Sequence, residues 1–283
     1  MRVSVVVLGL GAGLVPFAAL AGPPSLASHR AVYDITLLDA EEGTDVTGVT
    51  GRLVLEFTGS ECAGYTSRLR FVTEMEDVDG GLQMTDSRSE TFESADGKRL
   101  DFANQTYAGD TLAEESEGKA DRRGGDIAVA LTRPDEKRFV IKDSVVFPTQ
   151  QMERIIAAAV AGSPFVSFEV YDGSESGETV FETAGVIGKV STASDDAAAE
   201  PAVAAAGIAS LRHWPVTISY FDQRGTGEET PFYTLSFVVY ENGIGRTMRI
   251  DYGDFSLEGK LTGLEMLSPS PCAAPGGAAA APH

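Results

Sequence analysis

Residue types that build metal centres are scarce in this chain of 283 residues. It contains two cysteines, Cys62 and Cys272, and three histidines. Zinc and iron–sulfur sites require clusters of cysteine or histidine side chains at short spacing. The composition therefore nearly excludes such a site, and we predict no metal ligand and no cofactor.

The serines and histidines do not form a hydrolase motif. A nucleophile elbow reads Gly-x-Ser-x-Gly, whereas residues 173–177 read Gly-Ser-Glu-Ser-Gly and place Glu175 where the serine should be. His29 and His213 are the candidates for a general base, because His283 is terminal. Neither lies in a catalytic motif, so we expect both to be surface or edge histidines.

Acidic residues are abundant, above all between Glu74 and Asp96, but they form no diagnostic site. Residues 77–80, Asp-Val-Asp-Gly, resemble the start of a calcium loop, which needs glycine at its sixth position and glutamate at its twelfth. Leu82 and Arg88 stand there instead, so we expect a solvated acidic strand pair or turn. Paired carboxylates could hydrolyse glycosides, yet among 42 acidic residues no pair stands out. We therefore predict no catalytic residue and a protein that is not an enzyme.

Residues 1–21 predict a secretory signal peptide. Arg2 precedes an uncharged apolar stretch that ends in Ala-Leu-Ala, the small-x-small pattern cleaved by signal peptidase. We predict cleavage at this point and a periplasmic protein over 22–283. Cleavage after Ala27 and an uncleaved anchor over 3–20 are the alternatives. No later stretch is long and apolar enough to span a membrane as a helix.

Export places both cysteines in an oxidising compartment, where an even count favours a disulfide. Neither cysteine lies in a Cys-x-x-Cys motif or beside a histidine that would lower its pKa. A structural bridge between Cys62 and Cys272 is therefore favoured over a redox-active pair. It would tether the Pro/Ala-rich tail, residues 268–283, to the N-terminal part of the chain.

The charge balance restricts the class of partner. Forty-two acidic residues outnumber 22 basic ones and give a net charge of −20, which becomes −21 when Arg2 is removed with the signal peptide. Nucleic acids and anionic membrane surfaces attract basic proteins. We therefore expect neither as a partner.

Alternation with period two dominates residues 22–283. Over 51–57, for example, Leu53, Leu55 and Phe57 fall on one face. Similar segments, rich in β-branched and aromatic residues, are 31–37, 69–73, 82–93, 98–107, 127–131, 138–141, 165–171, 180–190, 216–222, 232–240, 245–251 and 255–261. Because no helices alternate with them, they predict an all-β, mainly antiparallel fold.

Residues 148–162 interrupt this alternation and predict one amphipathic helix. Pro148 suits its first turn, and Gly162 suits its end. The apolar side chains on one face are Met152, Ile155, Ile156, Ala159 and Val160. We expect this helix to lie across the curved sheet or to fill its mouth.

Residues 191–207 are rich in alanine and low in complexity. Pro201 should prevent a helix there, so we expect a flexible loop. Strands of the same type lie on both sides of it. We therefore predict a single β-rich domain, with two linked sheets as the alternative.

Short segments spread from His29 to Cys272 match a known family in order and spacing. They are 29–34, 147–149, 171–174, 214–221, 240–243 and 257–261. Together they resemble the EipB-like cell-envelope integrity proteins of alphaproteobacteria. The resemblance implies a periplasmic, curled, many-stranded β-spiral or barrel-like sheet around a helix, with a disulfide that maps onto the two cysteines. It also implies a part in envelope integrity, including under stress, and a periplasmic tetratricopeptide-repeat protein as functional partner.

We therefore expect a periplasmic protein that maintains the cell envelope by binding a protein partner or an envelope component. A carrier of lipid or lipoprotein, which needs a large apolar cavity, is the alternative. An envelope hydrolase, which needs converging carboxylates in a polar cleft, is a further one.

Overall fold

The computed structural model describes residues 25–142, 144–193, 200–222 and 230–272. In this part of the chain, fourteen strands form one antiparallel sheet in the order β8-β7-β6-β5-β4-β3-β2-β1-β14-β13-β12-β11-β10-β9. The strands are β1 (His29–Ala40), β2 (Val46–Ser60), β3 (Gly64–Asp77), β4 (Leu82–Glu93), β5 (Arg99–Ala108), β6 (Thr111–Arg123), β7 (Asp126–Arg133), β8 (Lys137–Lys142), β9 (Phe165–Val170), β10 (Phe181–Ile187), β11 (His213–Asp222), β12 (Tyr233–Tyr240), β13 (Gly245–Asp251) and β14 (Phe255–Met266). The all-β antiparallel fold predicted from the alternation is confirmed.

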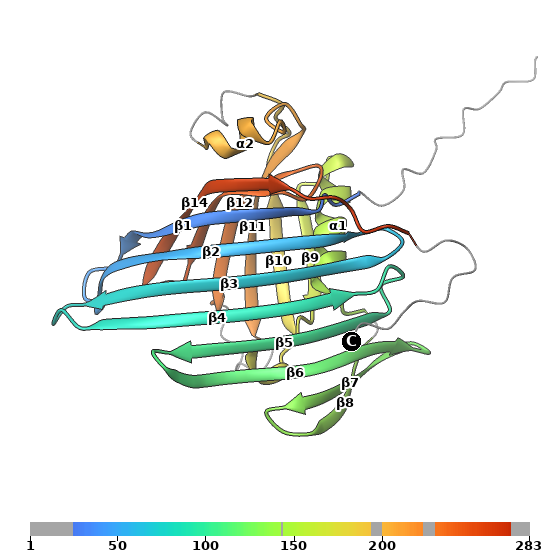
Figure 1. The fold of residues 1–283 in the computed structure, drawn as a ribbon, viewed down its shortest axis with the longest axis horizontal. Coiled ribbons are helices and arrows are strands. Elements are labelled where there is room, and N and C mark those ends of the chain that lie inside the picture. The colour runs from blue at the N-terminus through green and yellow to red at the C-terminus, as the bar shows by residue number, and fades with distance from the viewer. Residues whose placement is uncertain (1–24, 143, 194–199, 223–229, 273–283) are drawn as a thin grey trace, which may run out of the picture.

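The strand order makes this sheet an open spiral. β1 pairs with β14, so the first and last strands meet in its middle, while β8 and β9 form its two edges. Figure 1 shows β2, β3 and β4 crossing in front of β9–β12 at a steep angle. Irregularities in the β1–β14 register at Val32/Tyr33 and Leu37/Asp39 help the sheet to bend. The two halves of the sheet therefore face each other across an interior.

The predicted helix is present as α1 (Pro148–Val160) and packs inside the curl. Its buried residues are Gln151, Ile155, Ile156 and Ala159. Ile155, Ile156 and Ala159 belong to a core cluster with Tyr65 of β3 and with Trp214, Val216 and Val239 of β11 and β12. Val160, which the pattern placed on the buried face, is 48% exposed. The helix thus joins the two halves of the sheet at one end of the interior.

A second helix, α2 (Pro201–Ala205), corrects the expectation for residues 191–207. Pro201 begins this helix instead of preventing it, because proline lacks an N–H that would have no partner in the first turn. Val203 is fully buried in a cluster with Leu257 and Leu261 of β14. Residues 194–199 lie outside the described residues.

Glu200 fixes the start of α2 to the sheet. Its carboxylate accepts hydrogen bonds from the backbone N–H groups of Thr247 at 3.1 Å and Leu261 at 2.8 Å, and from the Thr247 hydroxyl at 2.9 Å. Arg246 Nη1 lies 3.6 Å from Glu200 Oε2, and both side chains are almost fully buried. Loss of one member of such a buried pair leaves the other charge unpaired, so this network holds α2 in place.

The structure joins Cys62 and Cys272 by a disulfide, with Cα atoms 5.4 Å apart. Cys62 lies in the turn between β2 and β3. The segment that follows β14 approaches the same turn, and the Ser270 N–H donates to the Gly59 carbonyl at 3.0 Å. This pairing agrees with the prediction, and it attaches the beginning of the C-terminal tail beside β2 and β3.

The two ends of the chain, which include the predicted signal peptide, are largely outside the part that the structure describes. The signal peptide predicted over 1–21 lies outside the described residues, as does most of the tail. Within the ranges that the structure describes, neither helix combines the length and apolarity needed to cross a membrane.

Candidate functional site

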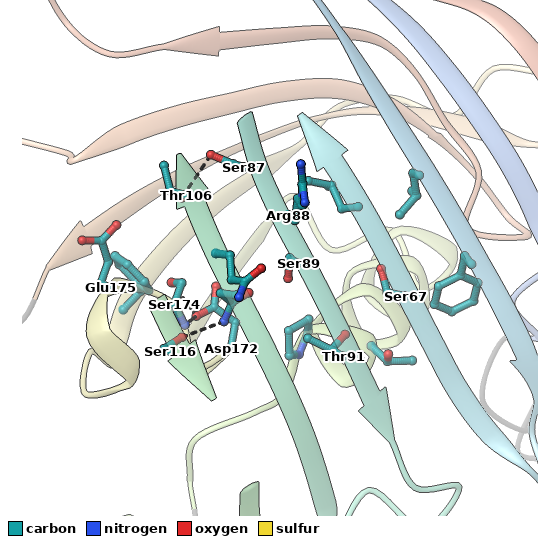
Figure 2. A pocket seen from close by; sticks show the side chains of 18 of the residues that line it. Ser67, Ser87, Arg88, Ser89, Thr91, Thr106, Ser116, Asp172, Ser174 and Glu175 are labelled. Atoms are coloured by element: carbon teal, nitrogen blue, oxygen red, sulfur yellow. Dashed lines mark hydrogen bonds between the residues drawn. The ribbon is translucent and has the colours of Figure 1, made fainter. Parts of the chain in front are cut away.

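A cavity of about 500 Å³ lies inside the curl, between the inner face of β2–β6 and the loops and strands opposite (Figure 2). Its apolar lining residues include Leu26, Leu55, Phe57, Leu69, Met152, Phe181, Phe232 and Tyr233. Its hydroxyl and amide lining residues include Ser67, Ser87, Ser89, Thr91, Asn104, Thr106 and Ser116. Carboxyl groups come from Glu114, Asp172 and Glu175, among others. The cavity therefore has an apolar wall and a polar wall.

The strand register explains the change from apolar to polar lining. One row of paired residues runs from Leu55 in β2 through Leu69, Ser89 and Asn104 to Ser116 in β6. Side chains at alternate positions of a strand point to the same face, so the inner face of β4 is a ridge of hydroxyl groups. Figure 2 shows this ridge beside the hydroxyl groups of the neighbouring strands. On the β2–β6 side of the cavity, the apolar and polar parts of the lining are thus opposite ends of one curved surface.

A loop at residues 171–177 closes one side of the cavity. The Gly173 carbonyl accepts hydrogen bonds from Asn104 Nδ2 at 3.0 Å and Ser116 Oγ at 2.5 Å. Gly173 has a φ of +76°, and a Cβ atom there would lie 2.3 Å from the Phe102 ring. Only glycine fits this close approach without a shift of the loop. These contacts hold the loop against β5 and β6.

Asp172 is the carboxyl group that this loop presents to the cavity. Its Oδ1 accepts hydrogen bonds from the backbone N–H of Ser174 at 2.9 Å and from the Ser174 hydroxyl at 2.7 Å. Burial raises the pKa of Asp172, and the bonds from Ser174 offset part of this rise. The carboxyl group is thus held in one orientation by its own loop.

Aromatic side chains surround the same end of the cavity. Phe232 stacks on Phe181 with ring centroids 6.3 Å apart, and Tyr220 stacks on Tyr233 at 4.6 Å. Burial, followed by the charge of Asp172, raises the pKa of Tyr220 to about 12. Both tyrosines therefore stay neutral at physiological pH.

Glu93 positions the helix that borders the cavity. It is 3% exposed, and it accepts a hydrogen bond from the backbone N–H of Thr149 in the first turn of α1. Burial raises the pKa of Glu93 to about 7, although the hydrogen bonds from Thr149 and Gln150 oppose this rise. Gln150 Nε2 also donates to the Gly97 carbonyl at 2.8 Å. These contacts fix the first turn of α1, and Pro148 and Thr149 of this turn form part of the cavity wall.

The expectation that His29 and His213 lie at the surface is wrong. They are 3% and 2% exposed, because β1 and β11 begin at these residues and turn both inward. His29 Nδ1 lies 2.7 Å from the Ala27 carbonyl, and His213 Nδ1 lies 2.9 Å from the Leu211 carbonyl. Burial lowers the pKa of His29. Both are core histidines; His29 contributes to the cavity lining, and so does Glu175 of the incomplete hydrolase motif.

The acidic segment from Glu74 to Asp96 covers the end of β3, all of β4 and the turn after it, so the expected strand pair and turn are present. Glu93 departs from the expected solvation, because it is buried. Asp77 Oδ1 accepts the backbone N–H groups of Asp79 and Gly81 at 2.9 and 2.8 Å, so this carboxylate serves the turn. Hydrogen bonds from Arg70 and Arg88 lower the pKa of the outward-facing Asp86 to about 2. Among the described residues, no group of three or more His, Cys, Asp or Glu is arranged to hold a metal ion.

The polar half of the cavity was not predicted from the sequence. Its signal is the pattern Thr-x-Ser-x-Ser-x-Thr over 85–91, which places hydroxyl groups on one face of a strand. A solvated face would show the same pattern. Only the curl of the sheet, which turns this face inward, distinguishes a strand that lines a cavity from a strand that faces solvent.

Comparisons with known proteins match nearly the whole chain. The EipB-like family model matches residues 20–268. The chain is 40% identical over 262 residues to the cell envelope integrity protein EipB of Brucella abortus (strain 2308), covering 90% of this chain and 92% of that protein. A crystal structure of a β-barrel-like protein with a domain of unknown function from Brucella abortus superposes with a TM-score of 0.79 at 40% identity, covering 86% of this chain and 99% of that one. The chain therefore belongs to the EipB-like family, as its sequence segments predict.

Proposed function

We propose that this protein helps to maintain the integrity of the cell envelope from the periplasm by binding a protein segment or an envelope component in its cavity, without catalysing a reaction. The observation that carries the proposal is the two-walled cavity inside the curl. Its volume of about 500 Å³ falls within the range of small-molecule sites. The name of the Brucella relative supports the envelope role.

The lining favours an amphipathic occupant. Leu55, Phe57 and Leu69 offer apolar contacts, whereas Ser89 and Asn104, on the next two strands of the sheet, offer hydrogen-bond donors and acceptors. An extended peptide segment also combines apolar and polar groups. Its side chains point to opposite faces, and its backbone N–H and C=O groups require hydrogen-bond partners. A protein segment therefore fits both walls.

A carrier of lipid or lipoprotein is the second candidate, and the apolar wall supports it. A single acyl chain could lie along Leu55, Phe57 and Leu69 with a polar group toward β4. From the family resemblance alone, we also propose a periplasmic tetratricopeptide-repeat protein as functional partner.

Binding of the neutral apolar fluorophore N-phenyl-1-naphthylamine tests the cavity as a binding site. Ser89→Phe places a ring inside the cavity, whereas the control Ala103→Phe places the same ring on the exposed outer face of the adjacent β5. We expect the wild type and Ala103→Phe to bind the probe and Ser89→Phe to lose most of this binding. Equal binding by all three would contradict the proposal. Mass spectrometry of what co-purifies with each variant then distinguishes a protein segment from a lipid.

A further inference from the structure

Carboxylates and aromatic rings gather at one end of the cavity. Asp172 and Glu175 come from the loop at 171–177, Phe232 immediately precedes β12, and Tyr233 begins this strand. Burial is the largest cause of the raised pKa of Tyr233, and the charges of Asp172 and Glu175 add to it. The acidic loop and the aromatic rings are therefore close enough to act on one ligand.

No basic side chain within the described chain forms an ion pair with Asp172. Its hydrogen bonds come from Ser174 of the same loop. The arginine among the cavity-lining residues, Arg88, directs its guanidinium to Asp86 at 2.6 Å and over the Tyr107 ring at 5.0 Å, away from Asp172. A carboxylate partly withdrawn from water is stabilised by a positive partner, and among the residues that the structure describes no basic side chain takes this place beside Asp172.

The rings provide a second, independent feature suited to a cation. Phe232 is 52% exposed although it stacks on Phe181, so one part of its ring remains open to a ligand. Its ring lies 5.9 Å from that of Tyr233 at an angle of 66°, so the two form a corner. The face of an aromatic ring attracts ammonium and guanidinium groups. A corner of rings beside a partly buried carboxylate is a favourable environment for such a group.

We infer that this end of the cavity binds an organic cation, an ammonium or guanidinium group, with Asp172 as its counter-charge and Phe232 and Tyr233 as its aromatic walls. The inference deepens the proposed function, on which it rests, by naming the chemistry of the ligand. The cation belongs either to a lysine or arginine side chain of a bound protein segment or to a small polyamine. The net charge of −20 favours the approach of either one.

The test is a titration followed by NMR, with the protein as it is recovered from the envelope. The probes are N-acetyl-lysine amide and its uncharged counterpart N-acetyl-norleucine amide. Asp172→Asn keeps the oxygen that accepts from Ser174 and removes the charge. Asp126→Asn is the matched control, because Asp126 is exposed at the start of β7, where it pairs with Arg123. This position is at the far end of β6 from Glu114, which lines the cavity. Phe232→Leu removes a ring that is 52% exposed, so we expect this variant to fold like the wild type.

We expect the lysine probe to bind the wild type and Asp126→Asn, and the norleucine probe to bind at least tenfold more weakly. Asp172→Asn should weaken lysine binding by about tenfold to a hundredfold, the usual effect of a charged hydrogen-bonding partner. Phe232→Leu should weaken it by about twofold to fivefold. If Asp172→Asn does not fold, Phe232→Leu and the norleucine comparison decide the question.

Two further probes distinguish the sources of the cation. The peptide acetyl-Lys-Val-Lys-Val-amide represents a protein segment, and spermidine represents a polyamine; tighter binding of one assigns the source. Equal binding of the lysine and norleucine probes, or no binding of any cationic probe, would overturn the inference. If N-phenyl-1-naphthylamine still bound the wild type and not Ser89→Phe, the proposed function would stand while this inference failed.

Discussion

Protonation of Glu93 should make the stability of this protein depend on pH between 4.5 and about 7. Glu93 lies buried at the first turn of α1, and its pKa is raised from 4.5 to about 7. The substitution Glu93→Gln keeps an oxygen that can accept the Thr149 N–H and removes the titration. The prediction concerns the difference in unfolding free energy between this variant and the wild type as a function of pH.

The magnitude follows from the two pKa values. Between pH 4.5 and 7 the folded chain keeps the Glu93 proton while the unfolded chain releases it. The folded state then binds more protons, so the unfolding free energy of the wild type falls as the pH rises. A difference of one pKa unit corresponds to about 1.4 kcal/mol, so the shift from 4.5 to about 7 corresponds to about 3 kcal/mol. Relative to the wild type, Glu93→Gln should gain this amount between pH 4.5 and 7.5.

Urea unfolding at several pH values measures this difference. Trp214 is the one tryptophan of the chain and is buried beside α1, so its fluorescence reports the transition. Glu90→Gln is the control, because Glu90 lies on the same strand with its side chain exposed. Other titrating groups, Asp172 among them, are common to all three proteins and cancel in the comparison. Parallel pH profiles for the wild type and Glu93→Gln would refute the reasoning.

Three further perturbations test the packing that supports the cavity, each by urea unfolding. Glu200→Ala leaves the buried Arg246 without its counter-charge and should cost about 3–5 kcal/mol; a loss below 1 kcal/mol would show that α2 is not held by this network. Cys62→Ser opens the disulfide and should cost about 2–5 kcal/mol under oxidising conditions, whereas under reducing conditions the variant and the wild type should be equally stable. Gly173→Ala drives a Cβ atom against Phe102 and should both destabilise the protein and weaken N-phenyl-1-naphthylamine binding; unchanged binding would mean that the loop does not shape the cavity.

The alternation of side chains was enough to predict the sheet, but not every strand. β6 was missed, because Thr111–Arg123 is mostly polar and charged and carries few of the β-branched and aromatic residues that indicate a strand. It forms because β5 and β7 pair with it on both sides. Tertiary pairing here outweighs local propensity.

The cavity could not be predicted from local sequence patterns, because it too depends on tertiary structure. The sequence shows which residues share a face of a strand, but burial of that face depends on how far the sheet curls. The inner face of β4 therefore reads as a solvated strand, and His29 and His213 read as edge residues. The position of Asp172 depends on the approach of Gly173 to β5 and β6, which lie far away in the sequence. The family resemblance indicated the spiral, whereas no motif indicated its lining.

The central claim is that the cavity is the part of the protein that serves the cell envelope. Its most direct test is complementation of a deletion strain, with sensitivity to detergents and cell-wall antibiotics as the readout. We predict that the wild type and Ala103→Phe restore resistance, and that Ser89→Phe, exported and folded to the same level, does not. Full restoration by Ser89→Phe would contradict the account.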